Sequence, residues 1–143
     1  MSIFPHPMKN KTKTERKTMY HVEIPLKLPS LNEYTNANRT KSYKGAKMKK
    51  DVQAAISPFL ETLPKIEKPI KIHFTWVEGN KRRDPDNCAF GKKFILDAMV
   101  NLGKLKDDNR KNVTAFTDDF EYGKTWMVKL DIEEINDVEI DKR

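Results

Sequence analysis

The sequence predicts one small domain of the α/β (α+β) class, in which two helices pack on a single mixed sheet. Three observations predict this fold. Stretches in which apolar and polar residues alternate, as in half-buried strands, are separated by stretches with apolar residues three and four positions apart, as in amphipathic helices. These elements follow the order β-α-β-α-β-β, and the last two strands are expected to form a hairpin. The 143 residues are enough for one hydrophobic core, and no repeat or internal linker divides them.

The strands are predicted from alternation. Residues 20–27 form the first strand, and Pro25 predicts that it lies at a sheet edge, because proline cannot donate a hydrogen bond to a neighbouring strand. A short strand is predicted at residues 112–117, and the final strand at residues 126–132. The most regular pattern belongs to residues 69–77, whose large apolar side chains share one face: Ile70, Ile72, Phe74 and Trp76.

Two stretches have the periodicity of helices. Residues 41–63 predict the first helix, which Pro58 is expected to break or kink. Residues 87–102 predict the second helix, with Gly103 as the residue that ends it. The second helix is apolar nearly all round and should be largely buried. The first helix has a single apolar stripe made of Met48, Val52, Ala55 and Phe59.

The remaining segments are predicted as loops and tails. Residues 1–18 form a basic tail and residues 136–143 a charged tail, on either side of a folded domain at residues 19–135. Residues 29–39 are rich in turn-forming residues and predict a loop, and residues 118–124 predict a turn.

The charge of the chain indicates a polyanionic partner. The net charge is +7, and residues 1–50 hold twelve Lys and Arg against three Glu, whereas the remainder carries a net charge of −2. A basic half joined to a half with clustered Asp favours binding to nucleic acid. The alternative is a protein that is basic without such a partner.

Other classes of site are disfavoured by the composition. Cys88 is the only cysteine, which excludes an internal disulfide and a cysteine-based zinc site and fits a reduced, cytoplasmic setting. The N-terminus has no apolar segment typical of a signal peptide, and no apolar run reaches the roughly 20 residues that span a bilayer. The absence of a glycine-rich phosphate loop argues against a nucleotide cofactor. We therefore expect neither a membrane nor a nucleotide as partner.

An acidic pair follows the second predicted strand. Asp84 precedes Pro85, which favours extended backbone at Asp84. In an extended chain, Asp84 and Asp86 point the same way and can aim two carboxylates at one point. Asp86 or Asn87 is then expected to begin the second helix as its N-cap.

A second acidic pair, Asp107 and Asp108, follows the second helix and can add a third carboxylate if the loop folds back. Converging carboxylates repel one another unless a hard divalent cation lies between them, and oxygen-only ligands suit Mg²⁺. Such an ion polarises a phosphoryl oxygen and can activate a water. Arg82 and Arg83, which precede the first pair, would attract a DNA backbone to this acidic centre.

Four further residues are candidates for DNA contact, each with an ordinary alternative. Asn32 and Arg39 belong to the predicted loop, which can hold a phosphate or can cap its own backbone with its amides. Lys44 and Lys47 lie near the start of the first helix, where positive charge opposes the helix dipole. Such an end is suited to receive phosphate, and a solvated basic face is the alternative.

Lys93 and Asp97 are charged residues four positions apart on the otherwise apolar second helix. One interpretation is a mutual salt bridge at the rim of the helix. The other aims Lys93 at the acidic site as a stabiliser of phosphate or of the leaving oxygen.

These residues carry a resemblance to a known family. In their order along the chain, residues 83–87 (Arg-Asp-Pro-Asp-Asn), 94–98 (Phe-Ile-Leu-Asp-Ala) and 107–108 resemble the RusA-type Holliday junction resolvases, the crossover junction endodeoxyribonucleases of bacteria and their phages. Residues 31–39 resemble the asparagine-rich N-terminal loop of that family. The resemblance covers roughly residues 20–132, and the preceding tail has no counterpart in it.

The resemblance implies a small α/β fold that acts as a homodimer and makes paired, Mg²⁺-dependent nicks in four-way DNA junctions during recombination and repair. Mn²⁺ is expected to substitute for Mg²⁺. A symmetric dimer suits this reaction, because a four-way junction presents two equivalent phosphates. Asp84 and Asp86 match the closely spaced catalytic aspartates of the family. Asp108 matches the third, and Asp107 is the neighbour that could be mistaken for it.

The catalytic lysine is assigned from the same resemblance. The chain has a few more residues between Asn87 and Asp97 than the family pattern. Counting back from Asp97 gives Lys93, with Lys92 as a possible substitute, whereas counting forward from Asp86 gives Phe90.

Two other functions fit the sequence. One is a metal-dependent nuclease with broader specificity for branched DNA. The other is a non-catalytic, basic DNA-binding module in which the aspartates only cap the second helix and turn the chain. In the enzyme, Asp108 must lie close to Asp84 and Asp86, whereas in the binding module it need not. A dimer interface is expected on the second helix, whose apolar surface exceeds what one small sheet can cover.

Overall fold

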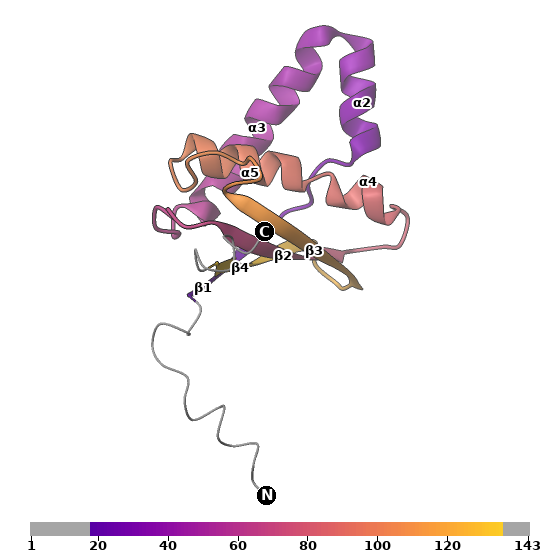
Figure 1. Cartoon of the computed structure of the whole chain (residues 1–143). Helices are drawn as coiled ribbons and strands as arrows, with labels where there is room; N and C mark the ends of the chain where they lie inside the picture. The colour runs from indigo at the N-terminus through magenta and orange to yellow at the C-terminus, as the bar shows by residue number, and fades with distance from the viewer. Residues whose placement is uncertain (1–17, 136–143) are drawn as a thin grey trace, which may run out of the picture.

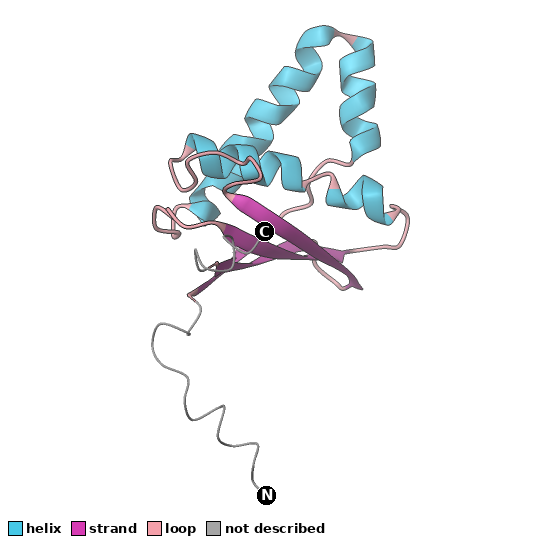
Figure 2. Ribbon diagram, in the orientation of Figure 1, coloured by secondary structure: helices cyan, strands magenta, loops and turns pink. Residues whose placement is uncertain are grey.

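The computed structural model describes residues 18–135, so the tail predicted at residues 136–143 and all but the last residue of the tail predicted at residues 1–18 lie outside the described residues. The described part is a single α+β domain with helices on one face of a four-stranded mixed sheet (Figures 1 and 2), which confirms the predicted class. The elements in chain order are β1 (Met19–Ile24), α2 (Leu31–Thr40), α3 (Ser42–Leu60), β2 (Ile70–Glu78), α4 (Pro85–Ala89), α5 (Lys92–Asn101), β3 (Val113–Tyr122) and β4 (Met127–Glu134).

The sheet has the strand order β1-β4-β2-β3. β2 lies inside the sheet, parallel to β3 and antiparallel to β4, and β1 is an edge strand, as Pro25 predicted. The predicted final hairpin is wrong, because β2 lies between β3 and β4. The connection from β3 to β4 crosses the end of β2, where Gly79 packs so closely on the Trp126 indole that a Cβ would collide with it.

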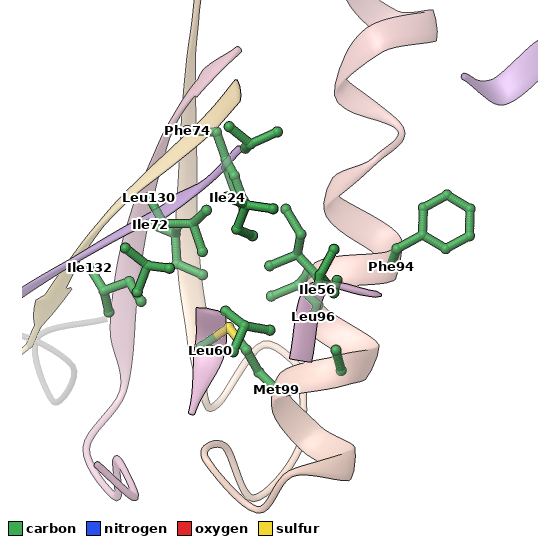
Figure 3. Packing of buried hydrophobic residues seen from close by; sticks show 14 of the residues in the cluster. Ile24, Ile56, Leu60, Ile72, Phe74, Phe94, Leu96, Met99, Leu130 and Ile132 are labelled. Atoms are coloured by element: carbon green, nitrogen blue, oxygen red, sulfur yellow. The ribbon is translucent and has the colours of Figure 1, made fainter. Parts of the chain in front are cut away.

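The core fills the space between the sheet and helices α3 and α5 (Figure 3). Phe74 of β2, Leu60 of α3 and Met99 of α5 are fully buried and belong to one cluster. Each such side chain contributes about 1.5–3 kcal/mol of transfer free energy. In the same view Phe94 of α5 points away from the sheet. The two sides of α5 are therefore both packed inside one chain, which removes the reason for expecting a dimer interface on it.

The first predicted helix is α3, with two differences from the prediction. Ala55 is exposed, whereas Val52 and Phe59 of the predicted stripe pack against the core beside the fully buried Ile56 and Leu60. Pro58 does not break the helix, because it lies in the last turn, where its missing N–H removes a single hydrogen bond.

The second predicted helix is divided into α4 and α5. The N-cap of α4 is Asp84 and its first residue is Pro85, so the helix starts earlier than predicted. The division falls at Phe90 and Gly91. A Cβ on the buried Gly91 would lie 3.1 Å from side-chain atoms of Leu28 and Trp76, so glycine allows a close approach here. The predicted end at Gly103 is confirmed by its positive φ of 75°.

The segment predicted as a loop at residues 29–39 is mostly helix α2. Its start is fixed by a capping box, in which the Ser30 hydroxyl accepts from the Glu33 backbone N–H at 3.1 Å and Glu33 accepts from the Ser30 N–H at 3.0 Å. The pattern of Ser followed by Glu three residues later is a helix-start signal that outweighs the turn-rich composition.

The turn predicted at residues 118–124 is wrong up to Tyr122, where β3 ends, and only residues 123–124 belong to the connection to β4. Parallel pairing with β2 supplies backbone partners along this stretch, up to the pair Glu78 and Tyr122. β3 is an edge strand, so its acidic side chains need not be buried. Asp118 instead accepts a hydrogen bond from the Trp76 indole N–H at 2.8 Å.

Replacing Ser30 by Ala should lower the free energy of unfolding by about 1 kcal/mol, because the N-cap of α2 loses its acceptor. Urea denaturation measures the loss. Ser42→Ala, on an exposed residue in the first turn of α3, is the matched control and should change stability by less than about 0.5 kcal/mol. Equal effects of the two substitutions would contradict the role of the capping box.

Candidate functional site

The connection from β2 to α4 is held by an ion pair between Arg83 and Glu78. Two parallel hydrogen bonds join them, with Nε to Oε1 at 2.8 Å and Nη2 to Oε2 at 2.7 Å. Arg83 Nη1 also donates to the Leu28 carbonyl at 2.7 Å, and its guanidinium lies 5.2 Å from the ring centre of Trp126. The side chains of Arg83 and Glu78 are only 11% and 12% exposed. This placement argues against the DNA contact predicted for Arg83 and gives it a structural role.

The neighbouring thiol of Cys88 is not a candidate nucleophile. Burial, followed by a hydrogen bond with Glu78 and the negative charge of that carboxylate, raises the pKa of Cys88 to about 12. The thiol therefore stays protonated and uncharged near neutral pH.

The first acidic pair, Asp84 and Asp86, follows directly after Arg83 in the chain. Asp84 has the extended backbone that Pro85 predicted, with φ −70° and ψ 157°. Asp86, however, is already inside α4, so the extended-chain argument for two carboxylates on one side does not hold. Both carboxylates are exposed, and Asp86 accepts only from the adjacent Asn87 backbone N–H at 2.9 Å among the described residues.

Asn87 does not act as the N-cap of the second helix, as predicted, but contacts α2. Its side-chain oxygen accepts a hydrogen bond from the backbone N–H of Asn32 at 2.9 Å. This contact ties the first turn of α2 to α4, so the acidic pair and the helical hairpin of α2 and α3 are held together.

Asp107 and Asp108, the second acidic pair, differ in their hydrogen bonds. Asp107 shapes its own loop, since its two oxygens accept from the Asp108 backbone N–H at 2.8 Å and from the Asn109 side chain at 3.2 Å. The Asp108 carboxylate accepts no hydrogen bond from any residue in the described part of the chain. Asp108 is therefore the better candidate for chemistry, in agreement with the predicted assignment.

A lysine–aspartate cluster lies next to these carboxylates and consists of Lys49, Asp97 and Lys93. Lys49 Nζ of α3 is 2.9 Å from Asp97 Oδ2, and Lys93 Nζ is 3.3 Å from Asp97 Oδ1. The hydrogen bond with Asp97 is the main cause of the raised pKa of Lys49, and the charge of Asp108 adds to it. The cluster therefore holds two ammonium groups with one carboxylate, within electrostatic reach of Asp108.

A cavity of about 510 Å³ opens beside the cluster. Lys49, Lys93 and Asp86 line it, together with three aromatic residues that we call the aromatic wall: Tyr34, Phe90 and Phe94. The wall comes from α2, from the end of α4 and from α5, and its ring centres are 5.4–5.8 Å apart. Charged groups thus stand at an apolar surface large enough for a small organic group.

The two candidate lysines point in different directions. Lys92 contacts strand β3, where its Nζ lies 2.8 Å from Asp118 Oδ2 and 4.5 Å from the ring centre of Phe116. Lys93 is 57% exposed and joins the lysine–aspartate cluster. Both line the cavity, but Lys93 is the one that shares a partner with Lys49. The salt bridge to Asp97 and a role in the site, posed as alternatives from the sequence, are compatible in this arrangement.

The three aspartates assigned to the metal do not form a ready-made ligand set. Within residues 18–135 no group of three or more His, Cys, Asp or Glu side chains is placed to hold a metal ion. The chemistry of the donors nevertheless fits Mg²⁺, because Asp84, Asp86 and Asp108 offer carboxylate oxygens that take part in no ion pair with described residues. Three uncompensated carboxylates repel one another, which favours separated side-chain positions.

The remaining predicted DNA contacts are on the surface. Asn32, Arg39, Lys44 and Lys47 are exposed on the hairpin of α2 and α3, which projects away from the sheet (Figure 1). Lys47 pairs with Asp51 at 2.7 Å. Arg82 is exposed in the loop after β2.

Sequence reasoning missed Lys49 and the aromatic wall as site features. Asp97 carried a usable signal, because a charged residue on a buried helix needs partners. Nothing in the sequence indicates that one of them comes from α3, since α3 and α5 meet only in the folded chain.

No family model matches this chain, and no curated protein matches it. None of the helices within residues 18–135 is long and apolar enough to cross a membrane.

Replacing Glu78 by Gln should lower the free energy of unfolding by about 3 kcal/mol or more, because it removes the carboxylate charge that Arg83 contacts most closely and leaves the largely buried guanidinium with only Glu33, at 3.6 Å. Equilibrium urea denaturation measures the change. Glu61→Gln is the matched control, since Glu61 is 59% exposed and pairs with Lys104 at the surface. The control should cost less than about 1 kcal/mol, and a similar small loss for Glu78→Gln would refute the bracing role.

Proposed function

We propose that this chain is a metal-dependent endodeoxyribonuclease of the RusA type, which cuts four-way DNA junctions as a homodimer. One observation carries the proposal: the lysine–aspartate cluster lies on a cavity with the free carboxylate of Asp86 and within electrostatic reach of that of Asp108. Carboxylates for a metal ion and ammonium groups for a phosphate are the two components that phosphodiester hydrolysis needs. Their order along the chain is the one that the family resemblance implies.

Asp84, Asp86 and Asp108 are the residues that would hold Mg²⁺, with Mn²⁺ as a substitute. The bound ion would supply Lewis acidity at the scissile phosphate and an activated water. Asp84 and Asp86 are exposed at the start of α4 and Asp108 is half-buried in the loop after α5, and binding of the ion would require the three side chains to turn towards it.

Lys93 is the residue that we assign to the phosphate or to the leaving oxygen. Its ammonium is 57% exposed and its bond to Asp97 is long, at 3.3 Å, which leaves donors free for a substrate oxygen. Asp97 is 15% exposed and orients the ammonium from behind. A cation held in advance at the position where negative charge develops stabilises the transition state.

Binding of the junction arms is assigned to the projecting hairpin of α2 and α3 and to the loop after β2. Arg39, Lys44 and Lys47 give the hairpin a positive surface, Asn32 lies at its base, and Arg82 lies beside the acidic pair. Contacts of this kind supply affinity that depends on salt but not on sequence. An enzyme for such a substrate would act in the cytoplasm of a bacterium or of a phage-infected cell.

The homodimer is assigned to β3 in place of the second helix. β3 is an open edge of the sheet, and three of its aromatic side chains are exposed: Phe116, Phe120 and Tyr122. Partly exposed aromatic side chains along a free strand edge favour association with a second copy.

A non-catalytic DNA-binding module is the second candidate. It is favoured by Asp107, whose side chain closes its own turn. Asp84 is the N-cap residue of α4, but its side chain makes no capping hydrogen bond. In that case the acidic residues serve the chain itself. A nuclease with broader specificity for branched DNA differs from the leading proposal only in the range of substrates.

Asp86→Asn should abolish cleavage of a four-way junction and leave binding equal or stronger, because it removes a metal ligand and a charge that repels phosphate. Cleavage is measured on labelled junctions with Mg²⁺, and binding in Ca²⁺ by gel shift. Full cleavage by the variant would remove the basis for the proposal.

Substitutions of Asp108 and of its neighbour Asp107 form a matched test and control. Asp108→Asn should lower the cleavage rate by at least about 100-fold, since loss of a direct ligand exceeds the usual effect of a group behind it. Asp107→Asn keeps a side-chain oxygen that accepts from the Asp108 N–H, and cleavage should stay within a few-fold of the original rate. The reverse order of effects would move the third ligand to Asp107.

A further inference from the structure

We propose that the cavity beside the lysine–aspartate cluster takes up one unstacked base of the junction at its branch point, and that this uptake selects branched over linear DNA. The inference rests on the proposed function and names the part of the substrate that the site recognises. It starts from the contrast within the cavity, whose apolar surface is mostly aromatic and whose charged groups include Lys93, assigned to the phosphate, and Asp86, assigned to the metal ion.

The aromatic wall has free surface. Phe94 is 1% exposed and anchors the other two rings, which lie at 83° to it for Tyr34 and 88° for Phe90. Tyr34 and Phe90 are only partly buried and are inclined to each other by 35°, with ring centres 5.4 Å apart. Two adjacent, partly open rings held from below can support a planar group, and every nucleobase offers such a face.

The polar groups around the wall fit the rest of a nucleotide. Lys49 and Lys93 share a single carboxylate, so the cluster carries one positive charge more than it neutralises. Phosphate can take up this surplus charge. The Tyr34 hydroxyl donates to no described residue and is available to a base edge. A nucleotide whose phosphate lies at the lysines and Asp86 therefore has its base next to the aromatic wall.

The cavity volume of about 510 Å³ is in the range of sites for small organic groups and is sufficient for one nucleobase. A base in linear duplex must first be unstacked, which costs a few kcal/mol, and the cost is lower where pairing is already disturbed. The branch point of a junction is such a place. The basic hairpin attracts any DNA backbone and therefore does not distinguish junctions from linear duplex. Uptake of a base by the cavity supplies a physical reason for this preference.

The test combines a change in the protein with a change in the DNA. Dissociation constants are measured by fluorescence anisotropy for the full chain in Ca²⁺ at fixed salt, on four-way junctions with either normal or abasic nucleotides at the branch point. Loss of the base should weaken binding by about tenfold. Tyr34→Leu should weaken binding of the normal junction by a similar factor. The Tyr34→Leu variant and the original chain should bind the abasic junction with the same affinity. Tyr34→Phe, which keeps the ring, is the matched control and should retain sensitivity to the base.

The outcomes separate this inference from the proposed function. Equal affinity of the original chain for normal and abasic junctions overturns the inference without any variant, and independent, multiplying effects of Tyr34→Leu and base removal overturn it as well. Mg²⁺-dependent junction cleavage alongside either result leaves the proposed function standing. A chain that binds no junction overturns both. Thermal unfolding of each variant shows whether a loss of binding reflects a loss of folding.

Discussion

The ion pair between Arg83 and Glu78 is the interaction on which the geometry of the site depends. It joins the end of β2, the Leu28 carbonyl and the first residues before α4 in a largely buried place. Burying two charges costs desolvation that their attraction only partly returns, so such a pair is better at specifying one arrangement than at adding stability. Here it specifies where the chain leaves the sheet, and hence where Asp84 and Asp86 emerge.

The candidate site is assembled from parts that meet only in the folded chain. α3 brings Lys49 and α2 brings Tyr34, and both reach α5 because Ile56 and Leu60 anchor α3 in the core. The hydrogen bond between Asn32 and Asn87 closes the arrangement from the other side. Asp97 then holds Lys49 and Lys93 together, because its carboxylate pairs with both ammonium groups. Movement of the helical hairpin would change the cavity and the lysine–aspartate cluster together.

A helix or strand could be predicted from the sequence where its signal lies within the segment itself. Strand alternation located β1, β2 and β4, and the positive φ of Gly103 followed from its place after an apolar helix. β3 was cut short because its acidic residues read as a turn, whereas the partner that extends it, β2, is remote in sequence. The strand order, which puts β2 between β3 and β4, is likewise a matter of tertiary packing.

The helical errors have a different origin. The capping box of α2 is visible in the sequence, but the turn-rich composition of residues 29–39 favours a loop, and the two local signals conflict. The division at Gly91 arises from contacts with Leu28 and Trp76, which no local pattern contains. For the site, the acidic residues were recognisable by motif, but the partner that Lys49 offers Asp97 and the aromatic wall follow from helix packing.

The most direct test of the account is cleavage of a labelled four-way junction beside a linear duplex of the same sequence, with Mg²⁺ and with EDTA. The account predicts symmetric nicks in two opposing strands, confined to the junction and absent in EDTA. Binding without cleavage in both Mg²⁺ and Mn²⁺ would contradict it, and would leave Asp84, Asp86 and Asp108 as residues that serve the fold of a DNA-binding module.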